Sequence, residues 1–369
     1  MTAYKIALLD GDGIGPEITA EAVKILKLIG TRNKLDLDLQ HGAFGANAYF
    51  DHGHSFPEAT KQLCDSADAI LKGPIGLNHE ESKKIPVDMQ PERGALLPLR
   101  RRYNTFANIR PVYLPKALAH FSPLKPEIIG DGIDFIIIRE LVGGLYFGKK
   151  ETGINEQGKR YVNESLEYDE DQIANIAKVA FETSMKRKKV LHNIHKSNVL
   201  KSSVLWNEVL EEVGQDFPEV EVKHILVDAA ATYLCLNPGQ FDVMVMENMF
   251  GDILSDQAGG ILGSLGLMPS ACLGPDKAYY EPSHGSAPDI AGQNIANPYS
   301  MIGSVAMMLE MSFGLEAEAR NVWHAMQSVF AQGNSTPDLS KPGEGVKMIS
   351  TQAFGDLVAE ELDKTPVPG

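Results

Sequence analysis

The sequence predicts an α/β fold, and three features lead to this prediction. Short apolar runs suit buried strands, longer stretches with helical spacing separate them, and a glycine-rich turn joins the first run to the first helix. The first run spans residues 4–9, the turn spans 10–17, and Pro16 suits a helix start ahead of the periodic stretch 18–29. Residues 149–161 are polar and contain glycine, which indicates an exposed arm. Further strands are expected at 69–71, 135–138, 190–194, 224–227 and 243–246, and further helices at 172–187, 204–213 and 298–311.

Composition excludes several classes of function. The chain has 369 residues, of which 43% are hydrophobic, so it is long enough for about two domains with a large core. Its 34 basic and 49 acidic residues give a formal net charge of −15, which disfavours nucleic acid and anionic membrane surfaces as partners. No run of about 18 apolar residues predicts a membrane span, and the first residues lack the pattern of a signal peptide. The three cysteines are too widely spaced for a disulfide framework or a zinc cluster, so we expect a cytoplasmic protein.

The glycine-rich turn does not have the spacing of a dinucleotide-binding fingerprint. Glycines at 11, 13 and 15 do not form G-x-G-x-x-G, and no acidic residue closes a clear second strand about 20 residues later. We therefore expect a tight turn at which the backbone approaches a ligand, rather than a standard Rossmann site.

A pair of aspartates is the strongest metal signal. In a helix covering 248–256, Asp252 and Asp256 are separated by four residues and project from one face, where two like charges destabilise the bare helix. A divalent cation would remove that cost, and carboxylate oxygens suit Mg²⁺ or Mn²⁺. Asp228, at the end of the apolar run 224–227, could supply a third oxygen. The alternative is an exposed acidic helix face, although the apolar and small neighbours favour a partly buried site.

Three arginines lie where an anion could meet them. Arg100 and Arg110 are ten residues apart, and Arg139 ends a very apolar run, where an unpaired cation would be costly. A guanidinium binds a carboxylate through a two-pronged hydrogen bond, so three such groups suit a dicarboxylate. The alternative for each is an internal salt bridge, for example between Arg139 and a neighbouring acid.

Two further motifs contain candidate proton-transfer groups. A glycine pair before Tyr146 and a single glycine after it indicate a turn that positions its phenol. Lys196 ends an apolar run, where a nearby cation and burial would lower its pKa. A packed core tyrosine and a solvated lysine are the alternatives. The long loop of small residues at 281–297 precedes a helix, and such loops carry binding functions more often than packing functions.

In this order, the motifs at 11–17, 251–256 and 281–292 resemble the β-decarboxylating dehydrogenases, the family of isocitrate, isopropylmalate, homoisocitrate and tartrate dehydrogenases. Segments 91–100, 106–111 and 139–148 most resemble the isopropylmalate members. The resemblance extends to about residue 350 and implies an isopropylmalate dehydrogenase-like two-domain fold with a mixed sheet. It implies a discontinuous cofactor-binding domain, 1–105 plus 263–369, and a central domain, 106–262, carrying the dimer interface and the arm.

The resemblance also implies roles, carried over by matched position. Tyr146 would be the general acid and Lys196, contributed by the partner of a homodimer, the general base. Asp252 and Asp256 would bind Mg²⁺ or Mn²⁺ with Asp228 of the partner subunit. The implied substrate-binding residues are Leu96, Leu97, Arg100, Arg110, Arg139, Val199 and Asp228. The implied cofactor-binding residues are Ile14, Glu92, Asn198, Glu281, His284, Gly285, Ser286, Ala287, Pro288, Asp289, Ile290 and Asn297.

The implied reaction is NAD-dependent oxidative decarboxylation of (2R,3S)-3-isopropylmalate to 4-methyl-2-oxopentanoate and CO₂, in leucine biosynthesis. The apolar pair Leu96 and Leu97 suits an isopropyl group and offers no partner to a third carboxylate. Asp289 at the adenosine ribose would accept hydrogen bonds from its hydroxyls and repel a 2′-phosphate, which favours NAD⁺ over NADP⁺.

Two departures concern the substrate. His195 stands before Lys196, where isopropylmalate members usually carry an acid, and 73–76 reads Gly-Pro-Ile-Gly instead of the more usual pattern. The alternatives are therefore a sister enzyme acting on homoisocitrate, isocitrate, tartrate or another alkylmalate, and a non-catalytic paralogue. Retention of Lys196, Tyr146 and the three aspartates speaks against the latter.

Overall fold

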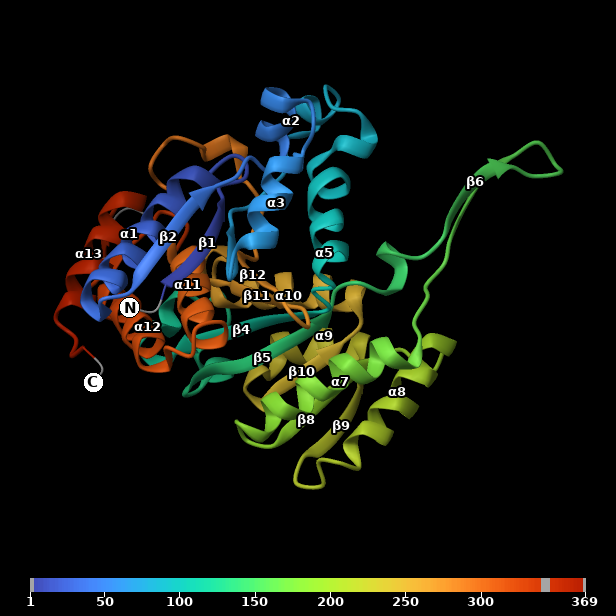
Figure 1. Cartoon of the computed structure of the whole chain (residues 1–369). Helices are drawn as coiled ribbons and strands as arrows, with labels where there is room; N and C mark the ends of the chain where they lie inside the picture. Colours follow the sequence, from blue (N-terminus) through green and yellow to red (C-terminus); the bar gives the residue numbers. More distant parts are fainter. Residues whose placement is uncertain (1–2, 340–345, 368–369) are drawn as a thin grey trace. The chain divides into compact units, whose positions relative to one another are not determined.

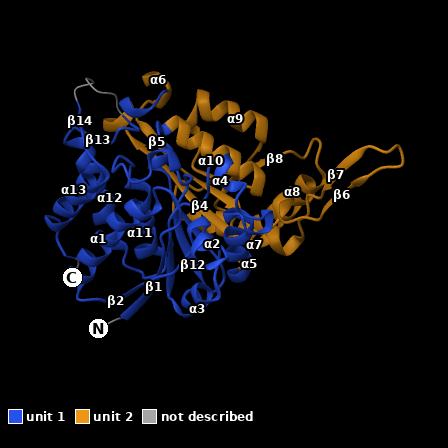
Figure 2. Ribbon diagram, turned by 90° about the horizontal axis from the view of Figure 1, so that it is seen from above, with its two compact units in different colours: residues 1–103, 120–123, 262–369 blue, residues 104–119, 124–261 orange. Residues whose placement is uncertain are grey.

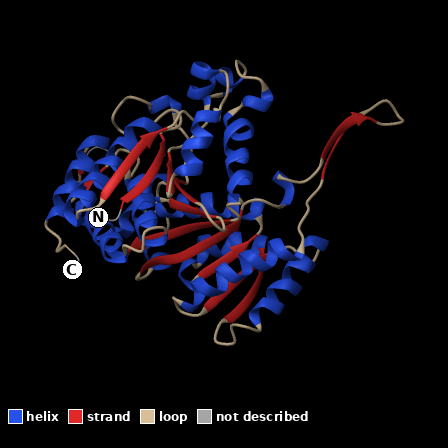
Figure 3. Ribbon diagram, in the orientation of Figure 1, coloured by secondary structure: helices blue, strands red, loops and turns tan. Residues whose placement is uncertain are grey.

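The computed structural model describes residues 3–339 and 346–367, and it has the predicted α/β fold (Figure 1, Figure 3). The chain divides into two compact units (Figure 2). Unit 1 contains residues 1–103, 120–123 and 262–369, and unit 2 contains 104–119 and 124–261. The expected domains are 1–105 plus 263–369 and 106–262, whereas the compact units change over after residues 103 and 261 and place the short stretch 120–123 in unit 1.

The strands of unit 1 that belong to the large mixed sheet have the order β2-β1-β3-β12-β11. β1 pairs in parallel with both β2 and β3, β12 pairs in parallel with β3, and β11 is antiparallel to β12. Every residue of β3 is buried, as expected for a strand covered on both faces. The bounds are β1 Ala3–Leu9, β2 Asp36–His41, β3 Ala69–Lys72, β11 Pro269–Leu273 and β12 Ala278–Pro282.

Helices cover this sheet, and α1 shows why the sequence forms them. α1 begins at Gly15 with Pro16 in its first turn and ends at Asn33, after which Lys34 adopts the left-handed conformation, and the apolar face of the helix is buried. α11 is buried along nearly its whole length. The bounds in unit 1 are α1 Gly15–Asn33, α2 Ala46–His52, α3 Glu58–Ser66, α4 His79–Ser82, α5 Leu97–Tyr103, α11 Tyr299–Met311, α12 Glu316–Ala331 and α13 Thr351–Asp363, with the short strands β13 Asn334–Ser335 and β14 Lys347–Met348.

The strands of unit 2 that form its mixed sheet portion have the order β4-β5-β10-β8-β9. β4 is antiparallel to β5, whereas β5, β10, β8 and β9 are parallel. Met246 of β10 pairs with Arg139 of β5 and with Ile194 of β8, so these three strands end together at one edge. Ligands of open α/β sheets bind beyond the carboxyl ends of the strands, so this edge is the place to seek a site. The bounds are β4 Ala107–Pro115, β5 Gly132–Glu140, β8 Val190–His195, β9 Glu221–Leu226 and β10 Val243–Met246.

The remaining elements of unit 2 are its helices and one hairpin. α7 begins with a capping box, in which Asp169 and Gln172 each bond the other's backbone N–H. The expected arm is the antiparallel hairpin β6–β7, which projects from unit 2 (Figure 1). The bounds are α6 Pro126–Ile129, α7 Glu170–Met185, α8 Lys201–Gly214, α9 Val227–Leu236, α10 Asn248–Leu262, β6 Lys150–Ile154 and β7 Arg160–Glu164.

Short helical turns join these elements. They are η1 Val87–Met89, η2 Glu92–Leu96, η3 Lys116–Phe121, η4 Gly144–Tyr146, η5 Pro238–Gln240, η6 Leu265–Leu267 and η7 Pro288–Ile290. In residues 3–339 and 346–367, no helix has the length and the apolar character needed to cross a membrane.

The predicted placement of Asp228 at the end of a strand is wrong. The apolar run 224–227 predicts a strand that ends before Asp228, but β9 ends at Leu226 and Asp228 lies in the first turn of α9. A short apolar run does not distinguish a strand from the start of a helix, and here the change from one to the other falls inside the run.

Candidate active site

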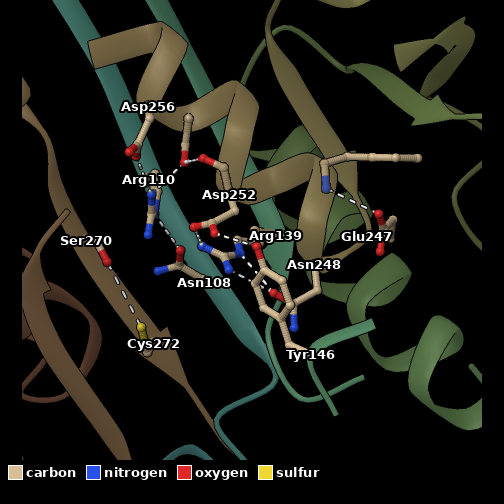
Figure 4. Close-up of polar contacts among 12 residues, drawn as sticks. Asn108, Arg110, Arg139, Tyr146, Glu247, Asn248, Asp252, Asp256, Ser270 and Cys272 are labelled. Atoms are coloured by element: carbon tan, nitrogen blue, oxygen red, sulfur yellow. Dashed lines mark hydrogen bonds and ion pairs between the residues drawn. The ribbon is translucent and has the colours of Figure 1, made fainter. Parts of the chain in front are cut away.

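The centre of the candidate site in unit 2 is the guanidinium of Arg139, which is 2% exposed at the end of β5. Its Nε and Nη2 donate to Oδ1 of Asn248, the first residue of α10, over 3.2 and 2.8 Å, and its Nη1 lies 2.5 Å from Oδ1 of Asp252 (Figure 4). The adjacent strands β5 and β10 bring these groups together, because α10 starts two residues after β10 ends. The internal salt bridge that the sequence left open as the alternative for Arg139 is therefore present, and its partner is the expected metal ligand Asp252.

Tyr146 approaches the same aspartate. Its phenol hydroxyl donates to Oδ2 of Asp252 over 2.8 Å, from the turn η4 that follows β5 (Figure 4). Burial and this hydrogen bond raise the pKa of Tyr146 to about 12. The phenol is consequently a proton donor throughout the neutral range, which is the state that a general acid requires.

Arg110 forms the second cationic contact with α10. From β4, its Nε donates to Oδ1 of Asn108 over 2.6 Å, and its Nη1 donates to Ser255 Oγ over 2.5 Å. The same Nη1 lies 3.6 Å from Oδ1 of Asp256. Arg110 is 5% exposed, so a buried positive group faces each of the two aspartates of α10.

The geometry of α10 agrees with the predicted placement of the two aspartates. Asp252 and Asp256 lie one turn apart in the helix, with side chains 42% and 56% exposed, so their oxygens remain accessible to a cation. Burial raises the pKa of Asp256, and the neighbouring charge of Asp252 raises it further. Two accessible carboxylates of one sign form a donor set of the kind that hard divalent cations prefer.

Asp228 and Lys196 form a separate pair in the same chain. Lys196 directly follows β8, and its Nζ donates to Oδ1 of Asp228 over 2.8 Å. This contact lowers the pKa of the Asp228 carboxyl. Within the described part of a single chain, no three His, Cys, Asp or Glu side chains are grouped to hold a metal ion, so Asp228 does not join Asp252 and Asp256 there.

In unit 1, the glycine-rich turn packs against the expected cofactor loop. The N–H of Ile14 donates to the carbonyl of Ser286 over 2.8 Å, and a Cβ at Gly13 would lie only 2.0 Å from that carbonyl oxygen, so only glycine fits. Asp12, 1% exposed, accepts the N–H groups of Ala46, Asn47 and Gly76. The turn is therefore a close approach of backbone segments, as expected.

The expected cofactor loop contains polar atoms whose partners are missing from the described residues. Nε2 of His284 and Oγ of Ser283 are buried there without a hydrogen bond, which is unusual in a folded protein. Asp289 is exposed on η7. A ligand with hydroxyl and phosphate groups would satisfy such atoms, so the loop fits a nucleotide. The side chain of Asn297, in contrast, already has partners: its Oδ1 accepts the N–H of Tyr299 and its Nδ2 donates to Asp338.

The remaining expected residues of unit 1 surround a buried charge cluster. Arg100, 6% exposed, donates from Nε to the hydroxyl of Tyr279 over 3.1 Å, and its Nη2 lies 4.0 Å from Glu281. Glu281 is itself paired with Lys72 at 2.6 Å. Leu96 and Leu97 are half-buried at the junction of η2 and α5, and Glu92 is exposed at the start of η2.

Several residues of these clusters carried no individual sequence prediction. Asn108 and Ser255 both bond to Arg110. Glu140, Tyr168 and Glu247 instead accept backbone N–H groups of Val142, Asn248 and Phe250, which are neighbours of the expected site residues. Asn108 and Ser255 stand inside the recognised motifs and could have been found by asking what satisfies a buried guanidinium. Tyr168 stands in no motif, and only the folded chain reveals its position.

Known proteins resemble the chain over nearly its whole length. The sequence model of the family described as isocitrate/isopropylmalate dehydrogenase matches residues 5–358. A 3-isopropylmalate dehydrogenase of Chromobacterium violaceum is 47% identical over 97% of this chain and 100% of its own, and one of Thermotoga maritima is 45% identical over 98% and 99%.

Solved structures agree with the sequence relatives. The crystal structure of isocitrate dehydrogenase from Methylococcus capsulatus aligns with a TM-score of 0.85 and 32% identity, covering 98% of this chain and 100% of that one. The apo form of a β-decarboxylating dehydrogenase from Thermococcus kodakarensis aligns with a TM-score of 0.77 and 30% identity, covering 98% and 96%. The chain belongs to the isocitrate/isopropylmalate dehydrogenase family of β-decarboxylating dehydrogenases.

Proposed function

We propose that the chain catalyses the NAD-dependent oxidative decarboxylation of 3-isopropylmalate to 4-methyl-2-oxopentanoate and CO₂, a step of leucine biosynthesis. The observation that carries the proposal is the cluster on β4, β5 and α10, where two buried arginines and a protonated phenol surround two aspartates. The relatives named 3-isopropylmalate dehydrogenase, 43–47% identical to this chain, support the same activity.

The residues of the chain have distinct tasks in this reaction. Arg110 and Arg139, with Arg100 of unit 1, bind the substrate carboxylates and restrict their motion before reaction. Lys196 accepts the proton of the C2 hydroxyl of the substrate. The hydrogen on C2 can then leave as a hydride to NAD⁺. Tyr146 returns a proton to the substrate carbon that loses CO₂. The raised pKa of Tyr146 keeps this proton in place until that carbon becomes basic.

The metal and the cofactor are part of the proposal. Asp252 and Asp256, with Asp228 of the partner subunit, would hold Mg²⁺ or Mn²⁺, and the loop from Glu281 would hold the adenosine half of NAD⁺. The cation would polarise the C2 oxygen and NAD⁺ would accept the hydride. Asp289 disfavours a 2′-phosphate by its negative charge, which makes NAD⁺ the proposed cofactor.

A homodimer is proposed because the site within one chain is incomplete. Lys196 and Asp228 pair with each other and are not grouped with Asp252. Apolar side chains on the same loop and helices as these residues are strongly exposed, among them Val199 at 71%, Leu236 of α9 at 63% and Ile253 of α10 at 60%. Exposed apolar groups of this kind mark protein interfaces, and a twofold-related second copy would supply the missing groups to both sites. Val199 and Asn198, adjacent to Lys196, are proposed to reach the partner's substrate and cofactor in the same way.

The substrate proposal is tested with a panel of 2-hydroxy acids. Purified protein with Mn²⁺ and NAD⁺ is assayed with 3-isopropylmalate, isocitrate, homoisocitrate, tartrate and malate. We expect the highest kcat/KM with 3-isopropylmalate, because Leu96 and Leu97 offer an apolar surface and no partner for a third carboxylate. A higher kcat/KM with a tricarboxylate would refute the substrate and retain the reaction class. Inert protein with every substrate would indicate a non-catalytic paralogue.

A further inference from the structure

We propose that Tyr168 is a positioning residue of the active site, which holds both the acid Tyr146 and the guanidinium of Arg139 in place. The inference rests on the proposed function for the roles of these two residues. It names a residue outside every motif that identified the family, and it follows from contacts within unit 2 alone.

The ring of Tyr168 lies against the turn that carries Tyr146. A Cβ at Gly143 would lie 2.5 Å from the Tyr168 ring, and one at Gly144 would lie 2.6 Å from its hydroxyl oxygen. No side chain fits in that space, which explains the glycine pair at this point of the sequence. The N–H of Gly144 also donates to the carbonyl of Glu167 over 2.9 Å, so the segment before α7 contacts the turn through both backbone and side chain.

The hydroxyl of Tyr168 connects this turn to α10. It donates to Oε2 of Glu140 over 3.0 Å and accepts the N–H of Asn248 over 3.0 Å. Glu140, fully buried, accepts in addition the N–H groups of Val142 and Gly143 over 2.7 and 2.9 Å. The backbone of the turn before Tyr146 is therefore held by a carboxylate that Tyr168 itself contacts.

Asn248 completes the connection to Arg139. Its Nδ2 donates to the carbonyl of Gly143 over 3.0 Å, while its Oδ1 accepts from Arg139. Oε2 of Glu247 lies 3.4 Å from the Tyr168 hydroxyl, and its Oε1 accepts the N–H of Phe250. The phenol of Tyr168 thus contacts two buried carboxylates and the first residue of α10. On one side this network reaches the turn of Tyr146 and on the other side it reaches Arg139, and both of these residues contact Asp252.

The charges of the network explain why a hydroxyl is required. Glu140 and Glu247 are both buried near each other, and burial raises the pKa of each carboxyl. A phenol can donate to one carboxylate and accept from a backbone N–H at once, whereas phenylalanine can do neither. Loss of the hydroxyl would leave the N–H of Asn248 without this acceptor and remove one of the contacts of Glu140, which would weaken the connection between the turn and α10.

The test compares Tyr168→Phe with Tyr146→Phe, the double variant and a matched control. Tyr103→Phe serves as the control, because it also removes a phenol hydroxyl that contacts a carboxylate, that of Asp65 at 2.7 Å, but lies in unit 1. Tyr168→Phe retains the ring that fills the space beside the glycines, and thermal unfolding monitored by circular dichroism checks that each variant is folded.

We expect Tyr168→Phe to lower kcat by about 10- to 100-fold, as displacement of a catalytic group by about 1 Å does, while the KM for NAD⁺ stays within about twofold. The double variant should be slower than Tyr146→Phe by less than the loss that Tyr168→Phe causes alone, because part of that loss acts through Tyr146 and only the remainder through Arg139. Unchanged kcat in Tyr168→Phe, or a double variant slower by the full product of the two losses, overturns the inference.

A second readout is independent of catalysis. Hydrogen–deuterium exchange of the ligand-free full chain should be faster in peptides covering 141–148 and 247–252 for Tyr168→Phe, and unchanged there for Tyr103→Phe. Exchange equal to that of the unmodified chain overturns the inference, whether or not the chain is active. If the unmodified chain is inert with every substrate, the proposed function fails, and this measurement alone decides the positioning role.

Discussion

The phenol hydroxyl of Tyr146 donates a hydrogen bond to Asp252 over 2.8 Å, and Asp252 also forms a salt bridge with the guanidinium of Arg139. The proposed acid, a proposed metal ligand and a proposed carboxylate-binding residue are therefore joined through one side chain. Each can be altered separately, and the expected effects differ.

Replacing Tyr146 by Phe is expected to remove the proton donor and leave the fold intact. General acid catalysis contributes about 10²–10⁴-fold, so kcat should fall within that range. The measurement is steady-state kinetics with 3-isopropylmalate. Tyr103→Phe is the control, and a Tyr146→Phe variant with full kcat would show that another group returns the proton.

The same tyrosine predicts a pH dependence of stability. Its pKa is raised from 10.0 to about 12 in the folded chain, so the folded state holds the proton more tightly than the unfolded state. Its contribution to stability is complete below pH 10 and is lost as the pH rises through 12. We expect the free energy of unfolding in urea to decrease less between pH 9 and pH 11.5 in Tyr146→Phe than in the unmodified chain. Equal decreases in both would contradict this.

Arg139→Lys is expected to impair substrate binding although the charge is kept. Lysine cannot make the two-pronged contact with Asn248 while also reaching Asp252. A charged hydrogen bond contributes about 1.5–3 kcal/mol, so kcat/KM for the substrate should fall by about 10- to 100-fold. Lys116→Arg, at an exposed surface pair with Asp131, is the control and should have no effect. If Arg139→Lys retains its kcat/KM, the geometry of the guanidinium does not matter.

Metal binding is expected to depend on Asp256. Added Mn²⁺ should raise the Tm of the unmodified chain with increasing concentration, since a ligand that binds only the folded state stabilises it. The Asp256→Asn variant should lose most of this Mn²⁺-induced rise in Tm. The substitution should not lower the Tm of the metal-free protein, because it removes a partly buried charge beside Asp252. Asp131→Asn, at an exposed surface pair, is the control and should keep the shift. A shift of equal size in Asp256→Asn would exclude that aspartate as a ligand.

Much of this arrangement could be predicted from the sequence, and the exceptions have physical causes. The strand at 243–246 was predicted residue for residue, because a parallel strand buried on both faces is a continuous apolar run. β4 escaped prediction because Asn108, Arg110 and Pro111 interrupt its apolar pattern. The two polar residues are buried in contact with each other, and Arg110 also contacts Ser255 of α10. β2 is polar because it is an edge strand with mostly exposed residues.

The candidate site divides in the same way. The four-residue spacing of Asp252 and Asp256 is a local property of a helix, so the sequence alone indicates their common face. The contacts of Tyr168 depend on the pairing of β5 with β10, which brings Glu140 and Glu247 to the same edge although they stand far apart along the chain. No spacing rule encodes such a contact. The pairing of Lys196 with Asp228 is likewise a product of the parallel strands β8 and β9.

Cofactor preference is expected to follow the charge at position 289. Asp289 is exposed on η7, so its repulsion of a 2′-phosphate acts largely through water, where unit charges about 4 Å apart interact by about 1 kcal/mol. Asp289→Asn should therefore reduce the preference for NAD⁺ over NADP⁺ by about fivefold. Asp289→Lys combined with Ile290→Tyr should reduce it further, because the repulsion becomes an attraction. The measurement is the ratio of kcat/KM for the two cofactors at low ionic strength, with Asp276→Asn, outside the loop, as the control. Because salt screens an exposed charge, the effect of Asp289→Lys should shrink as ionic strength rises, and an unchanged ratio in every variant would place the ribose away from Asp289.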